Sequence, residues 1–123
     1  MKEIKYVTNL DIKFDHLERI DISKMVEACK DQWYNQSLTK VNNSVVRLGI
    51  IEGEYHWHKH DNEDEFFYVI SGQLVLDLKD RTIELNPNQG ITVPKGIIHR
   101  TRAPKKTVML MVETSEILPT GDK

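Results

Sequence analysis

The sequence predicts an all-β protein, a sandwich or barrel of short antiparallel strands, with one short helix near the N-terminus. From Val41 onward, runs rich in Val, Ile, Leu, Phe and Tyr alternate with turn-forming pairs such as Ser71-Gly72 and Asn86-Pro87. About six to eight strands of this kind without intervening helices are typical of sandwiches and barrels, whose closure also protects the sheet edges.

The expected strands follow from these apolar runs and the turns between them. They are placed near Ser44–Glu52, Tyr55–His60, Glu65–Ser71, Gln73–Lys79, Arg81–Leu85, Gly90–Val93, His99–Ala103 and Thr107–Thr114. The first and last segments of the chain, residues 1–7 and 119–123, are expected at the surface. An N-terminal strand that pairs with a partner chain is the alternative for the first of these.

The helix is expected from Ile22 to Trp33, where apolar residues recur at spacings of three and four. Asp21 or Ser23 would cap its N-terminus. Two positions for this helix stay open. It could pack over one mouth of a barrel and shape a pocket there, or it could cover the outside of the sheet.

Length and composition indicate one compact domain. The chain has 123 residues, of which 39% are hydrophobic and 29% charged, and its formal net charge is -2. No broad basic surface is expected, which argues against nucleic acid and against an anionic membrane as partners. The single cysteine, Cys29, cannot form an internal disulfide, and no apolar segment is long enough to span a membrane. We therefore expect a cytoplasmic protein with a small-molecule ligand.

A group of histidines points to metal chemistry. His58 and His60 are two residues apart in an expected strand, so their imidazoles would project from the same face. A turn through residues 61–64 could return the Glu65 carboxylate beside them, and His99 follows the Pro94–Gly96 turn. Three imidazoles and one carboxylate suit a divalent transition metal such as Zn, Mn, Fe or Ni. The alternative is three unrelated surface or core histidines that share no ion.

These residues resemble the first of the two sequence motifs of the cupin family. That motif runs from a glycine to His-x-His, then to a glutamate and a second glycine. Here the pair His58-x-His60 is followed after four residues by Glu65, and six further residues separate Glu65 from Gly72. Gly53 stands one residue closer to the first histidine than the family pattern has it.

The second family motif is matched at its centre. Pro94-Lys95-Gly96 is followed after two residues by His99, as in the pattern. Asn88 occupies the position of the opening glycine and Ala103 that of the final asparagine. Asparagine tolerates the left-handed backbone conformation that such a glycine would adopt, so the fold is compatible with this change.

The resemblance to small single-domain cupins, including mannose-6-phosphate isomerase-like proteins, implies a cupin-type double-stranded β-helix, also called a jelly-roll barrel. It implies three segments: an N-terminal extension with the short helix (1–43), the barrel (44–114) and a C-terminal tail (115–123). The positions of the family's metal ligands fall on His58, His60, Glu65 and His99. The family also implies a small-molecule ligand or substrate in the barrel and a homodimer.

Two functions are compatible with this site. As an enzyme, the protein would use the metal as a Lewis acid in isomerase, lyase or dioxygenase chemistry. As a non-catalytic binding or sensing protein, it would keep a structural or vestigial metal site. The sequence assigns no catalytic residue. Tyr55, His56 and Tyr68 are the pocket candidates for acid–base chemistry or for orienting the ligands, and Asp64 and Asp77 are further candidates for orienting them.

Overall fold

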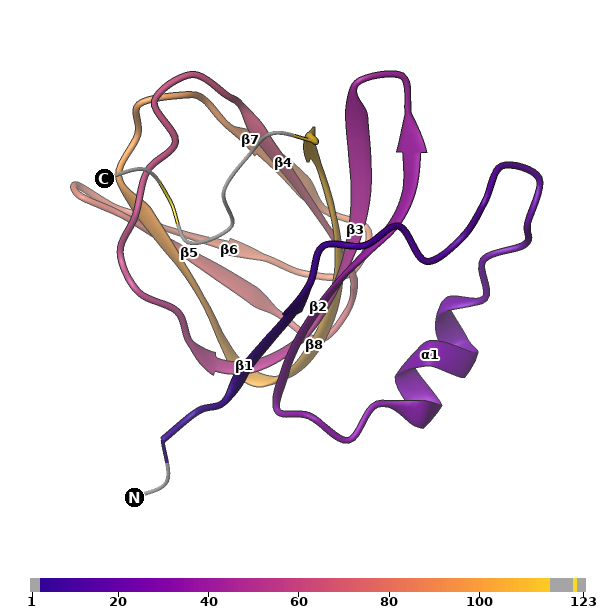
Figure 1. Cartoon of the computed structure of the whole chain (residues 1–123). Coiled ribbons are helices and arrows are strands. Elements are labelled where there is room, and N and C mark those ends of the chain that lie inside the picture. The colour runs from indigo at the N-terminus through magenta and orange to yellow at the C-terminus, as the bar shows by residue number, and fades with distance from the viewer. Residues whose placement is uncertain (1–2, 116–120, 122–123) are drawn as a thin grey trace.

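The computed structural model describes residues 3–115 and residue 121. Within them the chain forms eight β-strands and one short α-helix (Figure 1). The elements, in chain order, are β1 (Tyr6–Asn9), α1 (Ile22–Ala28), β2 (Trp33–Val41), β3 (Ser44–Glu54), β4 (Glu65–Ser71), β5 (Leu74–Leu78), β6 (Thr82–Leu85), β7 (Gly90–Val93) and β8 (His99–Thr114). The all-β class with a short N-terminal helix is therefore confirmed.

Strand β8 holds the barrel together because it pairs with three other strands. The sheet follows the order β1-β2-β3-β8-β4-β7, and β5 pairs with β6 and with β8. The C-terminal half of β8 lies between β3 and β4, whereas its N-terminal half pairs with β5, as in the register Leu78↔His99. This change of partners rolls the sheet around an interior (Figure 1).

The sequence predicted two strands, His99–Ala103 and Thr107–Thr114, where the structure has one. The prediction of a break was wrong, and the β3–β8 register gives the reason. Its partners pass from Ile51↔Thr107 to Gly53↔Ala103. Pro104 therefore lies at an irregularity of the ladder, where its missing N–H costs no strand hydrogen bond.

Two hydrophobic clusters lie on opposite faces of the sheet formed by β2, β3 and β8. The inner cluster fills the barrel and includes Phe67, Val69 and Met109. The outer cluster is centred on Leu48 and Ile50 and includes the apolar face of α1. The helix thus covers the outside of the sheet, as Figure 1 shows, and not a barrel mouth. No helix in the part of the chain that the structure describes is long and apolar enough to cross a membrane.

Helix α1 ends at Ala28, five residues before the predicted end at Trp33. Its start was predicted correctly, since the Asp21 carboxylate accepts a hydrogen bond from the Lys24 backbone N–H at 3.1 Å. The predicted helix was too long because its last residue belongs to a paired strand instead. Trp33 is the register partner of Ile51, so this residue is already extended.

Strand β2 was missed in the sequence, and β1 pairs with it in parallel within the same chain. The predicted N-terminal extension therefore adds two strands to the sheet of the barrel. One register row is important for the site: Thr8 lies beside Asn35, and Asn35 lies beside Gly49.

Candidate metal centre

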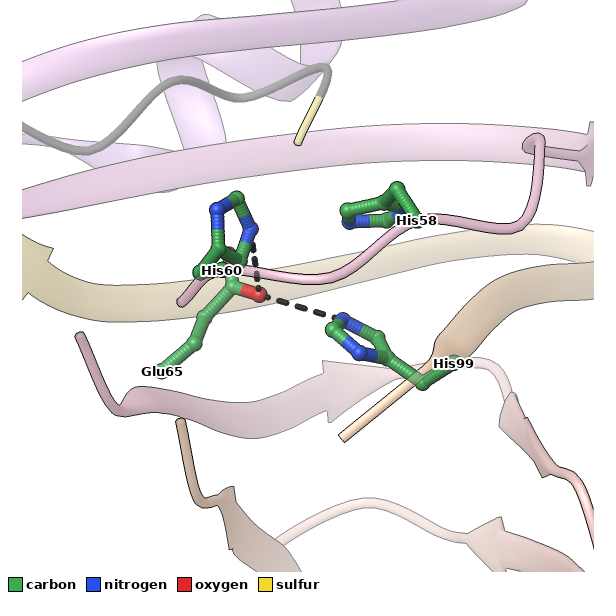
Figure 2. Close-up of side chains that lie close together, drawn as sticks. All are labelled: His58, His60, Glu65 and His99. Carbon is green, nitrogen blue, oxygen red and sulfur yellow. Dashed lines mark ion pairs between the residues drawn. The ribbon is translucent and has the colours of Figure 1, made fainter. Parts of the chain in front are cut away.

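Three histidines and one glutamate from distant parts of the chain meet inside the barrel (Figure 2). Glu65 and His99 are the first residues of β4 and β8, and His58 and His60 lie on the segment between β3 and β4. Each side chain offers a ligand atom, and these four atoms all lie within 4.8 Å of one another. The Glu65 Oε1 atom is 3.4 Å from His99 Nε2 and 3.6 Å from His60 Nε2.

The expected strand Tyr55–His60 is not formed, so strand alternation does not position His58 and His60. Only an isolated bridge joins His58 to His99, through two backbone hydrogen bonds of 2.9 Å. The loop that follows is tied to the Pro94–Gly96 turn. The Gly96 N–H donates to the His60 carbonyl at 2.7 Å, and the Lys95 N–H donates to Asp64 Oδ1 at 2.9 Å. These contacts bring both sequence motifs together.

The imidazoles of His58 and His99 are held in orientations that would suit metal binding. Nδ1 of His58 lies 3.0 Å from the His56 carbonyl, and Nδ1 of His99 lies 2.9 Å from the Ile97 carbonyl. A carbonyl only accepts hydrogen bonds, so Nδ1 carries the proton and Nε2 keeps its lone pair. Burial lowers the pKa of His58 to about 4 and also lowers that of His99. Both rings are therefore neutral near pH 7, the form that binds metals.

The donor set fits a divalent ion. Glu65 Oε1 and His99 Nε2 are buried, and neither has a hydrogen-bond partner among the residues that the structure describes. With a neutral imidazole, their 3.4 Å contact places a lone pair against a carboxylate oxygen, which is unfavourable unless a cation lies between them. Nitrogen and oxygen donors in this proportion suit Zn, Mn, Fe or Ni, and do not single out one of them.

A cavity of about 30 Å³ adjoins the cluster and includes His58 and Glu65 in its wall. Trp33, Tyr55 and Phe67 form much of its aromatic lining. The Trp33 and Tyr55 rings are stacked, with centroids 5.4 Å apart. A single water needs about 10–15 Å³, so the space is sufficient only for a small group beside the cluster.

A buried contact between Arg47 and Glu113 lies next to the cluster, and the sequence did not predict it. Arg47 Nε is 2.9 Å from Glu113 Oε1, and both side chains are almost fully buried. Burial, a hydrogen bond with Glu65 and the charge of Glu65 raise the pKa of Glu113 to about 10, and burial raises the pKa of Glu65. Glu113 thus supports the Glu65 carboxyl group. The available signal was its phase, because Glu113 follows the inward-facing Met109 and Met111 at a spacing of two residues and so points to the same face.

The three pocket candidates lie in different places. Tyr55 lines the cavity, and its ring packs edge-on against His58 with centroids 5.4 Å apart. His56 is exposed, with its ring centroid 4.2 Å from that of Tyr55. Tyr68 is on the outer face of β4, where its hydroxyl lies 3.0 Å from Asn88 Oδ1. Of these candidates, only Tyr55 is among the described residues that line the cavity.

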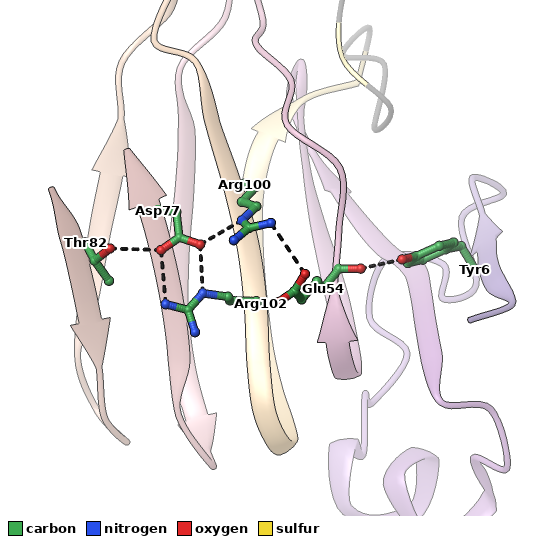
Figure 3. A network of polar contacts seen from close by, with 6 residues as sticks. All are labelled: Tyr6, Glu54, Asp77, Thr82, Arg100 and Arg102. Atoms are coloured by element: carbon green, nitrogen blue, oxygen red, sulfur yellow. Dashed lines mark hydrogen bonds and ion pairs between the residues drawn. The ribbon is translucent and has the colours of Figure 1, made fainter. Parts of the chain in front are cut away.

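The two other orienting candidates are away from the donor atoms. Asp64 binds the Lys95 backbone, as described above, and Asp77 lies in a network on the outer face of the barrel (Figure 3). Hydrogen bonds from Arg102, and then from Arg100 and Thr82, hold the pKa of Asp77 well below its usual range. Asp77 thus points to the outer face of β5, where the two arginines cover it, and not to the donor atoms.

Residue 121 returns to the site from the C-terminal tail. Gly121 has a φ of +89°, and a Cβ atom added there would lie 2.5 Å from the His58 Cβ. A side chain at this position would therefore displace either His58 or the backbone of residue 121.

A rolled β-sheet with a three-histidine, one-glutamate cluster in its interior defines a class of barrel proteins with an internal candidate metal centre. The chain belongs to the cupin family, since the model of the cupin domain matches residues 46–114. This match confirms the family resemblance of the two sequence motifs.

The chain is similar to three further proteins. The uncharacterized protein YdbB of Bacillus subtilis is 45% identical over 85 residues, which are 68% of this chain and 75% of YdbB. A mannose-1-phosphate guanylyltransferase of Sinorhizobium fredii is 36% identical over 81 residues, which are 65% of this chain but 16% of that enzyme. The crystal structure of a cupin-2 domain protein from Shewanella frigidimarina has a TM-score of 0.73 and 26% identity, covering 77% of this chain and 93% of that one.

Proposed function

We propose that His58, His60, Glu65 and His99 hold a divalent transition-metal ion, and that this ion binds a small polar molecule in the barrel cavity. The observation that carries the proposal is the meeting of four donor atoms within 4.8 Å, in a buried site. The unpartnered Glu65 Oε1 and His99 Nε2 atoms support it, because burying them without a cation would be costly.

The bound ion would act as a Lewis acid that polarises an oxygen atom of the ligand. The side chains of the barrel supply the other requirements. Neutral imidazoles and the Glu65 carboxylate bind the ion, and Trp33 and Phe67 exclude water from one side of the cavity. Apart from the cluster itself, Tyr55 and Glu113 are the described cavity residues that can exchange a proton with a ligand. Isomerase, lyase and dioxygenase chemistry all stay compatible with this arrangement.

The alternative is a binding or sensing protein without turnover, in which the same ion and cavity would hold the ligand without a chemical step. The two functions differ in what they require of Glu113. If catalysis uses this carboxyl group as an acid, Glu113→Gln abolishes turnover while ligand binding persists. If the protein only binds its ligand, Glu113→Gln changes the affinity for the ligand, and neither the unchanged protein nor the variant shows turnover.

The test of metal binding is an elemental analysis of the purified protein and of single-site variants. We expect close to one divalent ion per chain in the unchanged protein, and a large loss in His58→Ala and His99→Ala. His16→Ala is the matched control, because His16 lies at the surface, with its Nε2 atom 3.1 Å from the Lys40 carbonyl. Metal content that is equal in all four proteins would refute the assignment of the ligands.

We also propose a homodimer. Strand β1 stands at one end of the strand order, so one of its edges has no strand neighbour among the described residues. An open edge of this kind can pair with a second copy. Light scattering at micromolar concentration should give twice the mass of one chain, and a monomer mass would contradict the proposal.

A further inference from the structure

Asn35 lines the cavity from strand β2, outside the segment 46–114 that matches the cupin domain. Its register partners are Thr8 on β1 and Gly49 on β3, and both of these also line the cavity. Thr8 is exposed, so this row of residues leads from the surface into the interior. The N-terminal strands therefore provide one wall of the proposed binding site.

The side-chain oxygen of Asn35 is a buried acceptor with no hydrogen-bond partner within residues 3–115 and residue 121. Its neighbour Gln36, on the other face of β2, is fully bonded. The Gln36 amide nitrogen donates to the carbonyls of Asp11 and Ser37, and its amide oxygen accepts from Tyr34 and Asn9. Since unpaired buried acceptors are rare and unfavourable, the Asn35 oxygen is suited to accept an O–H or N–H of a ligand.

The charges of the interior indicate the sign of that ligand. In the described part of the barrel interior the charged side chains are Arg47, Glu65 and Glu113. With a divalent ion at the cluster, and even with both carboxyls ionised, the formal sum is two plus one minus two, an excess of one positive charge. Uncompensated charge in a buried site is costly, so a ligand with a single negative charge would lower this excess, and would cancel it when both carboxyls are ionised.

The size of the cavity limits this anion to a few non-hydrogen atoms. Besides its aromatic residues, the wall contains Met109 and Met111, whose terminal methyl groups lie against Gly49. A Cβ added to Gly49 would be 2.9 Å from the Met109 methyl carbon. The space next to Asn35 thus depends on a glycine, and apolar side chains form only part of the cavity wall.

We propose that the ligand is a small monoanion that also carries a hydroxyl group, and that Asn35 selects it by accepting the hydrogen bond of this hydroxyl. The inference rests on the proposed metal function, because the anionic oxygen would bind the ion held by the cluster. Asn35 is then a specificity-determining residue contributed by the N-terminal strands.

The test uses the full-length protein loaded with Co²⁺, whose visible spectrum reports on its ligands. Metal content is measured first, and the protein is then titrated with glycolate, acetate, 3-hydroxypropionate, propionate and ethylene glycol. We expect each hydroxylated anion to bind about tenfold more tightly than its partner without the hydroxyl, as one hydrogen bond to a buried acceptor would give. The uncharged diol should not bind in the same concentration range.

Asn35→Ala and Asn35→Leu should reduce the preference for the hydroxylated anion by about tenfold and leave the metal content unchanged. Neither variant should lower the melting temperature of the ligand-free protein, because each removes an acceptor that has no partner. Gln36→Ala is the matched control: it should lower the melting temperature by about 5 °C and keep the anion preference.

The outcomes separate this inference from the function on which it rests. A protein that takes up no Co²⁺ overturns both. A loaded protein that binds none of the anions, or whose preference is the same in the Asn35 variants, overturns only the inference. A preference that disappears in Gln36→Ala, but persists in Asn35→Ala, would also overturn it.

Discussion

The first residues of β8 place polar side chains on both faces of the strand, and the two sets differ in their hydrogen bonding. His99 and Thr101 face the interior, and Arg100 and Arg102 alternate with them on the outside. On the outside, Asp77 accepts hydrogen bonds of 2.7–3.2 Å from both arginines and one of 2.9 Å from Thr82 (Figure 3). On the inside, Glu65 Oε1 and His99 Nε2 have no such partner among the described residues.

This difference separates polar groups that stabilise the fold from polar groups that are available to a ligand. The outer network is complete within the protein, since both carboxylate oxygens of Asp77 accept hydrogen bonds from guanidinium groups. Trp57 adds to it, with the Arg100 guanidinium carbon 5.1 Å from its ring centroid. The inner cluster is incomplete and buried. We therefore expect substitutions outside to change stability, and substitutions inside to change metal binding.

The largest effect is expected for His58→Ala. Removing one of four ligands should weaken metal binding by more than about 100-fold, beyond the 10- to 100-fold typical of losing a residue that only supports a ligand. His58 is only partly buried, so the metal-free variant should fold. Isothermal titration with Zn²⁺ measures the change. An affinity within about threefold of the unchanged protein would remove His58 from the ligand set.

Asp77→Ala should lower the stability of the fold and leave metal binding unchanged, the reverse of the effect expected for His58→Ala. It removes the acceptor of two arginines, and hydrogen bonds to charged groups contribute about 1.5–3 kcal/mol to stability. We expect the free energy of unfolding in urea to fall by an amount in this range, with unchanged metal affinity. A loss of metal binding without a loss of stability would show that the two faces are not independent.

The two faces of the barrel should respond to pH in opposite directions. Asp77, on the outside, should contribute less stability as the pH falls, and Glu113, on the inside, should contribute less as the pH rises. The pKa of Asp77 is lowered in the folded protein, so its stabilising contribution is present at neutral pH and is lost on acidification below about pH 4. The pKa of Glu113 is raised to about 10, so the folded, metal-free protein binds a proton that the unfolded chain has released. This contribution to stability should then decline as the pH rises from about 5 to 10, by at most about 1.4 kcal/mol per pH unit.

Unfolding curves of the metal-free protein at several pH values check this prediction. Glu113→Gln should flatten the decline on the alkaline side, and Asp77→Asn should flatten the loss on the acid side. An alkaline decline that is equally steep in Glu113→Gln would mean that another group is its source.

Tyr68→Phe should have the smallest effect. The Tyr68 hydroxyl contacts Asn88 on the outer face of β4, and one partly exposed hydrogen bond contributes about 0.5–1.5 kcal/mol. Metal and anion affinities should not change, whereas Tyr55→Phe, in the cavity wall, should alter anion affinity. A change in anion binding for Tyr68→Phe alone would place Tyr68 in the binding site.

The sequence predicted the barrel and the meeting of its motifs because alternation and turn residues are local signals. It did not predict the end of α1 or the strand β2, since the spacing of Met25, Cys29 and Trp33 is helical while Trp33 pairs with Ile51. Nor did it predict that β8 continues past Pro104. In both cases a partner strand from another part of the chain decides the local structure.

The four proposed ligands could be named from the motifs, but their surroundings could not. Glu113 and Asn35 lie at inward-facing positions of strands whose register depends on neighbours. A charged residue in phase with core methionines was a usable signal for Glu113. Asn35 had no such signal, because its placement follows from the pairing of β2 between β1 and β3.

The most direct test is anomalous diffraction from crystals of the protein loaded with Zn²⁺. The proposed centre predicts one strong peak among His58, His60, Glu65 and His99, at about 2.0–2.2 Å from the three imidazole nitrogens and the carboxylate. A loaded protein whose peak lies elsewhere, or which shows no peak between these four side chains, would contradict the assignment of the cluster as a metal centre.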